Sequence, residues 1–69
     1  MEIKWEDGAE IRFTPQREGA LLSANRAGLL SLAGLLHSLA DGTKGGHVHL
    51  DAYNAFEDGS AELIIEKID

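Results

Sequence analysis

Two segments in the second half of the chain, residues 47–51 and 60–68, carry the side-chain alternation of β-strands. Successive residues of a strand point to opposite faces. One face of the first segment therefore carries polar side chains, those of His47, His49 and Asp51. The opposite face carries Val48 and Leu50. The second segment has isoleucine on both faces, which predicts a central strand or a sheet face that is covered in a dimer.

The chain is short, and its size limits how it can be stabilised. Its 69 residues predict a single domain, 1–69, that buries only about 60% of the surface of the unfolded chain. The sequence contains no cysteine, so disulfides and thiolate metal sites are excluded. A chain with no signal peptide and no apolar run near 18 residues is expected to be cytoplasmic, with no membrane partner.

The charge of the chain is acidic and unevenly distributed. The formal net charge is −6, and most of the excess acidic residues fall in residues 36–69. An acidic surface repels phosphate backbones, so nucleic-acid binding is not predicted. The same surface would attract a basic partner, such as the active cleft of a nuclease. Alternatively, the charge only keeps a small domain soluble.

The N-terminal part predicts a β-hairpin. Asp7-Gly8 is typical of a tight turn, and a three-residue loop, residues 6–8, places apolar side chains on one face and opposite charges on the other. Pro15 is expected to end the second strand, because proline cannot donate a ladder hydrogen bond. Residues 16–22 then form a connector. The apolar pairs predicted in this register are Met1 with Phe13, Ile3 with Ile11 and Trp5 with Ala9.

Residues 27–40 predict a helix. Ser23 or Asn25 can cap its start, and Asp41-Gly42 is expected to end it with a left-handed glycine. The predicted core stripe consists of apolar residues at helical spacing: Leu29, Leu32, Ala33, Leu36, Leu39 and Ala40. Leu30 and Leu35 widen this stripe, which favours a helix in a deep groove or one whose flank contacts another subunit. Two glycines, Gly28 and Gly34, are tolerable where another backbone approaches closely.

These elements together predict the fold. Two strands, a helix and two strands, in the order ββαββ, indicate an α+β fold with one helix packed across a four-stranded, mostly antiparallel sheet. Between the last two strands, Tyr53 and Phe56 are both expected to pack back onto the core.

The polar face of residues 47–51 is a candidate metal site. Two histidines at i and i+2, His47 and His49, with Glu62 and Glu66 across from them, could bind zinc or a similar divalent ion. A hydrolase site would need further histidines from distant segments, and the only other one is His37 on the helix. The alternative is an exposed sheet face on which imidazoles pair with carboxylates. No cofactor is predicted.

Catalytic motifs are absent from the sequence. It has no cysteine nucleophile, GxSxG elbow, phosphate-binding glycine loop or dinucleotide fingerprint. A domain of this size also has little room to enclose a deep substrate pocket. The sequence therefore predicts a protein that is not an enzyme and has no catalytic residue.

Four strings of residues, 28–33, 47–51, 53–54 and 59–67, resemble one small bacterial family, the immunity protein family 32 of polymorphic toxin systems. The resemblance covers about residues 28–68. It implies an antidote that binds and blocks a partner toxin, and it carries no catalytic residue across to this chain.

Three kinds of protein therefore remain open. The first is an acidic immunity-type binding module, whose predicted contacts with a basic toxin are Asp51, Glu57, Asp58, Glu62 and Glu66. The second is a small homodimeric protein with a divalent-metal or small-ligand site at His47 and His49. The third is a dimeric structural module whose outer sheet face or helix flank is its subunit interface.

Overall fold

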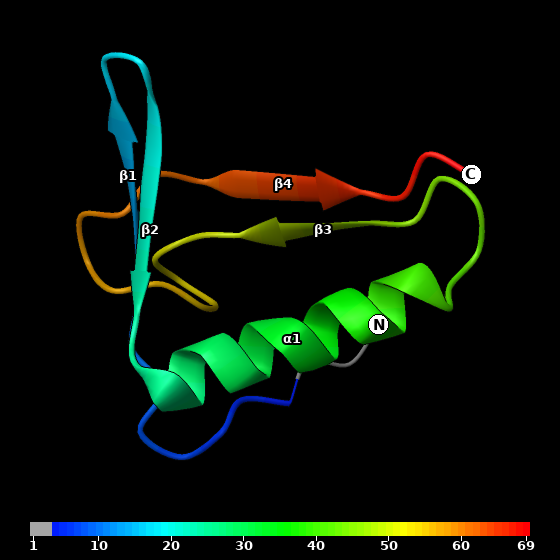
Figure 1. Ribbon diagram of the computed structural model, residues 1–69, viewed down its shortest axis with the longest axis horizontal. Helices are drawn as coiled ribbons and strands as arrows, with labels where there is room; N and C mark the ends of the chain where they lie inside the picture. Colours follow the sequence, from blue (N-terminus) through cyan, green and yellow to red (C-terminus); the bar gives the residue numbers. More distant parts are fainter. Residues whose placement is uncertain (1–3) are drawn as a thin grey trace.

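A computed structural model describes residues 4–69, which contain one helix and two two-stranded antiparallel sheets (Figure 1). In chain order the elements are β1 Ile11–Gln16, β2 Gly19–Ala24, α1 Arg26–Ala40, β3 His47–Leu50 and β4 Leu63–Glu66. The hairpin of β1 and β2 stands across the direction of the β3–β4 hairpin, and α1 runs alongside β3. The fold is α+β, as the sequence predicts.

The prediction of a single four-stranded sheet is wrong. The edge of β1 that faces away from β2 is occupied by the loop between β3 and β4. The Glu57 N–H donates to the Ile11 carbonyl at 2.7 Å, and the Ala61 N–H donates to the Phe13 carbonyl at 3.0 Å. The Phe13 N–H donates in turn to Ser60 Oγ at 3.2 Å. An irregular segment thus satisfies the backbone of β1 where a third strand would have to pair.

The predicted N-terminal hairpin is also wrong. The strand β1 pairs with β2, which follows it in the chain, and not with the residues that precede it. Phe13 lies opposite Leu22 in this ladder, and residues 16–22, the predicted connector, contain the turn and most of β2. The Asp7-Gly8 turn does form, with Gly8 at φ 77°, yet residues 4–10 contain no strand and Trp5 does not pair with Ala9. The pairings proposed for Met1 and Ile3 lie outside the described residues.

Pro15 lies inside β1 instead of ending it, and the hydrogen bonds of Phe13 explain why. The N–H and carbonyl groups of Phe13 point away from β2, towards Ser60 and Ala61. Two residues further along a strand, the backbone nitrogen points the same way. The missing N–H of Pro15 therefore leaves the β1–β2 ladder intact.

The helix α1 begins at the second of the two predicted caps. Asn25 Oδ1 accepts the Gly28 N–H at 2.8 Å and also the Glu10 N–H at 3.0 Å, while Asn25 Nδ2 donates to the Gly8 carbonyl at 2.8 Å. One side chain therefore caps the helix and ties it to the segment before β1. Within residues 4–69, no helix has the length and apolarity that crossing a membrane requires.

The predicted left-handed glycine at the end of α1 is wrong. Asp41 is the C-cap with φ −87°, and its N–H donates to the His37 carbonyl at 3.2 Å. The Gly42 N–H donates to the Leu39 carbonyl at 3.1 Å, three residues back. A tightened last turn satisfies these carbonyls, so no residue with positive φ is needed there.

The face of α1 that packs on the core differs in part from the predicted stripe. The buried residues of the helix are Gly28, Ser31, Leu32, Leu35 and Leu39. Four members of the predicted stripe are instead exposed, namely Leu29, Ala33, Leu36 and Ala40. Gly28 explains the rotation, because a Cβ built there would lie 2.6 Å from the Glu10 carbonyl oxygen and 2.8 Å from Ile11 Cγ1. Close approach at this glycine turns its side of α1 towards β1, whereas Gly34 has no such neighbour.

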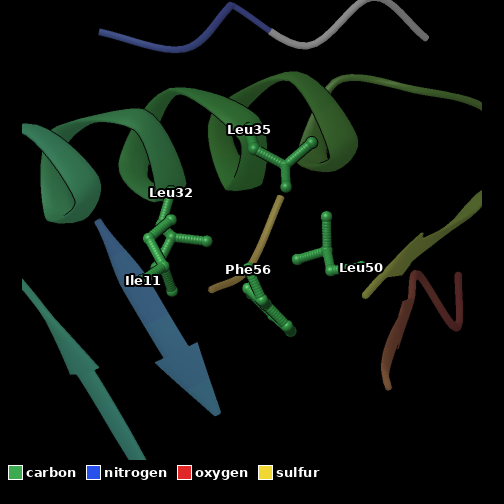
Figure 2. Close-up of a cluster of buried hydrophobic side chains, with 5 residues drawn as sticks. All are labelled: Ile11, Leu32, Leu35, Leu50 and Phe56. Carbon is green, nitrogen blue, oxygen red and sulfur yellow. The ribbon is translucent and has the colours of Figure 1, made fainter. Parts of the chain in front are cut away.

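The core lies between α1, β1, β3 and the loop that follows β3 (Figure 2). Its buried side chains are Ile11, Leu32, Leu35, Leu50 and Phe56. Phe56 packs inward as predicted, with its ring centroid 6.1 Å from that of Phe13. Tyr53 does not pack onto the core, contrary to the prediction, and is 98% exposed.

Replacing Asn25 with alanine is expected to lower the free energy of unfolding by about 1–2 kcal/mol, because the helix cap and both bonds to residues 8–10 are lost. Asn25→Asp is the matched control. It keeps the capping oxygen near the positive end of the helix and loses only the Nδ2 donor, so a smaller loss is expected. Urea unfolding followed by circular dichroism measures both. Equal losses for the two variants would contradict a capping role for Oδ1.

Candidate partner-binding surface

The side of the β3–β4 sheet that faces away from the core gathers most of the polar residues singled out from the sequence. His47 lies opposite Glu66 in the ladder, and His49 lies opposite Ile64. Val48 and Leu50 turn towards the core, which confirms the predicted alternation of this strand. We define the outer face of the β3–β4 sheet as five exposed residues: His47, His49, Glu62, Ile64 and Glu66.

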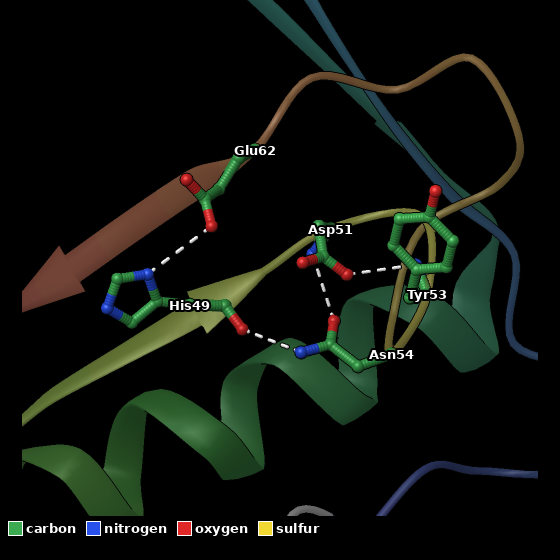
Figure 3. A network of polar contacts seen from close by, with 5 residues as sticks. All are labelled: His49, Asp51, Tyr53, Asn54 and Glu62. Carbon is green, nitrogen blue, oxygen red and sulfur yellow. Dashed lines mark hydrogen bonds and ion pairs between the residues drawn. The ribbon is translucent and has the colours of Figure 1, made fainter.

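The histidines of this outer face contact each other and one carboxylate. His49 Nδ1 lies 3.3 Å from Glu62 Oε2, and both side chains are about half exposed (Figure 3). The rings of His47 and His49 meet edge to face, with centroids 5.1 Å apart. A solvated pair of this kind contributes only about 0–1 kcal/mol to stability. Its polar groups remain accessible to a partner.

The same two histidines, His47 and His49, are the predicted metal pair. In the part of the chain that the structure describes, no three histidine or carboxylate side chains come together as metal ligands. The third histidine, His37, lies on α1, where its Nδ1 is 3.3 Å from Asp41 Oδ2. His47 and His49 are thus neighbours without an assembled set of ligands around them, and the metal site stays a prediction.

Asp51 has a different environment from the outer face. Its carboxylate accepts the Tyr53 N–H at 2.9 Å, and its backbone N–H donates to Asn54 Oδ1 at 2.9 Å. Asn54 Nδ2 donates to the His49 carbonyl at 2.8 Å (Figure 3). These bonds fold the chain into a turn directly after β3, and they account for the Asp51 and Asn54 of the sequence pattern. Among the predicted contact residues, Asp51 is half-buried and engaged within the protein.

Glu57 and Asp58 lie at a second acidic location, beside the start of β1. They line a shallow open hollow of about 710 Å³ together with Glu10 and Arg12. Arg12 Nη1 donates to the Asp58 carbonyl at 2.8 Å, which leaves the carboxylate of Asp58 free to face solvent. The structure therefore does not bring all five predicted contacts together. It places Glu62 and Glu66 on the outer face and Glu57 and Asp58 at the hollow.

Sequence reasoning missed two contributors to these surfaces. Ile64 lies between Glu62 and Glu66 on the outer face and is 52% exposed. Side-chain alternation places it on this face, but it is not among the predicted contacts. Glu10 belongs to the hollow only because the loop after β3 docks beside it, and no local pattern in the sequence predicts that docking.

Comparison with known proteins links the chain to one family. The family model described as Immunity protein 32 matches residues 20–68, more than two thirds of the chain. The match covers α1, β3, β4 and all of β2 except Gly19. The match includes the outer face of the β3–β4 sheet, as well as Glu57 and Asp58. Comparisons with curated proteins and with solved structures find no match.

Proposed function

Because the chain belongs to the Immunity protein 32 family, we propose that it binds a partner toxin and neutralises it by occupying the toxin's active cleft, without catalysis of its own. The family match over residues 20–68 is the observation that carries this proposal. The net charge of −6 supports a basic cleft, such as that of a nuclease, as the target.

We propose the outer face of the β3–β4 sheet as the main contact. Glu62, Ile64 and Glu66 alternate along the chain, so their side chains stand on one side at intervals of about 7 Å. An exposed isoleucine between two carboxylates has the composition of a small interface, in which an apolar centre is surrounded by a polar rim. The carboxylates would steer a basic partner, and Ile64 would be desolvated in the complex.

Glu57 and Asp58 are proposed as secondary contacts. Their hollow is open and acidic, with Arg12 already bound to the Asp58 carbonyl. A lysine or arginine of the toxin could enter it with little rearrangement. A contact through Asp51 also remains a proposal, although its carboxylate would have to leave the Tyr53 N–H to bind a partner.

Charge reversal on the outer face tests the proposal. With the partner toxin domain as the titrant, Glu62→Lys combined with Glu66→Lys is expected to raise the Kd about 10- to 100-fold and to weaken the salt dependence of the Kd, because electrostatic steering is lost. Calorimetric titration at two salt concentrations measures both effects. Protection of cells that express the toxin should fall in parallel.

Glu18→Lys is the matched control, because Glu18 is exposed at the turn between β1 and β2, away from the outer face. It should leave the Kd within about twofold. If Glu18→Lys weakens binding as strongly as Glu62→Lys or Glu66→Lys alone, only net charge matters and the outer face is not the contact. A chain that binds no toxin at all would contradict the function itself.

A further inference from the structure

We propose that the exposed side of α1 is a contact surface for a second copy of this chain, with the two helices packed antiparallel about a twofold axis. This proposal goes beyond toxin binding, and it concerns a surface separate from the outer face of the β3–β4 sheet. The proposed contact surface consists of the four exposed residues of the predicted stripe, Leu29, Ala33, Leu36 and Ala40. We call them the outer stripe of α1.

The outer stripe has the spacing of a helix–helix contact. Its residues follow one another at intervals of four, three and four, which is the spacing of a coiled-coil seam. Leu29 is 54% exposed and Leu36 is 47% exposed. Large apolar side chains gathered on one helix face, with no cover in the monomer, mark an interaction surface.

Two flanks of α1 are already occupied. One face packs on the core through Leu32, Leu35 and Leu39. A neighbouring flank is held by the N-terminal segment, where the Glu6 N–H donates to Ser31 Oγ at 2.8 Å. The outer stripe is therefore an apolar part of the side of α1 that stays exposed. The helix lies along one side of the molecule, where a partner can reach it (Figure 1).

The charge distribution favours a second copy as the occupant. The chain carries 12 acidic residues, and none of them falls between residues 19 and 40. Arg26 is the one Lys or Arg in that interval. Two molecules of net charge −6 repel each other least where neither presents carboxylates. A basic toxin, by contrast, would be drawn to the acidic surfaces elsewhere, so the two partners would not compete for the same face.

An antiparallel arrangement makes the outer stripe complementary to itself. When Leu29 of one copy meets Ala40 of the second copy, Leu36 meets Ala33 in the same register. Each large side chain then faces a small one, which lets the helices approach closely. The same register brings Arg26, at the start of the helix, within about one turn of Asp41 of the second copy. The twofold axis repeats both the apolar contacts and this ion pair.

Sedimentation of the full chain without toxin, from about 1 μM to about 1 mM, tests the proposal. The expected result is a concentration-dependent dimer. Leu29→Glu with Leu36→Glu should weaken it about 100-fold or more, because four carboxylates enter the contact. Leu22→Glu is the matched control, because Leu22 is 40% exposed but lies on β2, away from the outer stripe. The Leu22→Glu variant should form the dimer with the same dissociation constant as the wild type.

Charge swaps test the antiparallel register itself. Arg26→Asp and Asp41→Arg should each weaken the dimer about tenfold, and the double variant should restore it. Each swap places its new charge favourably for the helix dipole, so neither should unfold the monomer. A melt at a concentration where the wild type is monomeric verifies this.

Three results would overturn the proposal: a monomer at every concentration, a dimer broken by Leu22→Glu but not by the α1 variants, or charge swaps that do not rescue each other. Because the toxin is absent from these measurements, their failure would leave the toxin-binding proposal intact. Loss of toxin binding would equally leave the dimer unaffected.

Discussion

Replacing Phe56 with alanine is expected to lower the free energy of unfolding by about 3–5 kcal/mol, the largest stability effect of any single change proposed for this protein. Phe56 is 4% exposed and belongs to the buried cluster that joins α1, β1 and β3. A domain of 69 residues has a total unfolding free energy of about 3–10 kcal/mol. The Phe56→Ala variant should therefore be largely unfolded or close to it.

Tyr53→Ala is the matched control, because it removes an aromatic side chain from the same loop. Tyr53 is 98% exposed, so its loss should change the free energy of unfolding by no more than about 0.5 kcal/mol. Urea unfolding followed by circular dichroism measures both variants. Equal losses would mean that the loop contributes through its backbone turn and not through the buried ring.

Gly28→Ala and Gly34→Ala are expected to shift stability in opposite directions, although both replace a glycine within the same helix. Helix propensity alone predicts that each gains up to about 1 kcal/mol. At Gly28, however, the new Cβ would lie 2.6 Å from the Glu10 carbonyl oxygen and 3.2 Å from Ala24 Cβ. Backbone cannot yield as a flexible side chain can, so α1 must move away from β1. A net loss of about 1–3 kcal/mol is expected.

Gly34 is the control for this effect, because no atom lies within 4 Å of a Cβ built there. Gly34→Ala should therefore realise the helix-propensity gain and raise the melting temperature, whereas Gly28→Ala should lower it. Thermal melts of the two variants against the wild type give the answer. If the Gly28→Ala variant were as stable as the Gly34→Ala variant, α1 would not be in close contact with the backbone of Glu10 at this position.

The strands and the site were predictable where side-chain alternation was clear. His47, Val48, His49 and Leu50 occupy the predicted faces of β3. Leu63 and Ile65 pack towards the core from β4, as the same alternation requires. Period-two alternation fixes the register of such a hairpin, because a slip of one residue would turn its apolar side chains outward. The acidic residues of the candidate surface follow from the same pattern.

The rest of the fold depends on contacts that no local pattern carries. Around α1 the apolar residues form two adjacent stripes, and the choice between them depends on the close contact of Gly28 with the backbone of Glu10. Local rules place the first hairpin at Asp7-Gly8 and end its second strand at Pro15. Pro15 is tolerated inside β1 because residues 57–61 lie along that edge.

The residues of the candidate site also fall into two groups, those that alternation predicts and those that depend on contacts elsewhere in the chain. Glu62 and Glu66 were predictable as surface residues of the last strand segment, because they alternate with the apolar residues Ala61, Leu63 and Ile65 in the sequence. Asp51 belongs to the same alternating string, yet its carboxylate binds a backbone N–H in the turn after β3. Sequence alternation gives the face of a residue, whereas its hydrogen-bond partners depend on where the following residues turn.

The attachment of residues 57–61 to β1 has a consequence for how the chain folds. Isolated two-stranded hairpins are at best marginally stable in water, so neither hairpin of this protein should persist alone. The bonds from Arg12 to Asp58 and from Phe13 to Ser60 link positions 46 and 47 residues apart. Such closure carries an entropic cost that local turns do not, and it is recovered only when both halves of the chain are in place.

Folding of the two halves is therefore a single cooperative event, and the outer face of the β3–β4 sheet exists only in molecules whose first hairpin has also formed. A destabilising change in β1 would reduce the fraction of molecules competent to bind a partner. The molecules that remain folded would bind it as tightly as before.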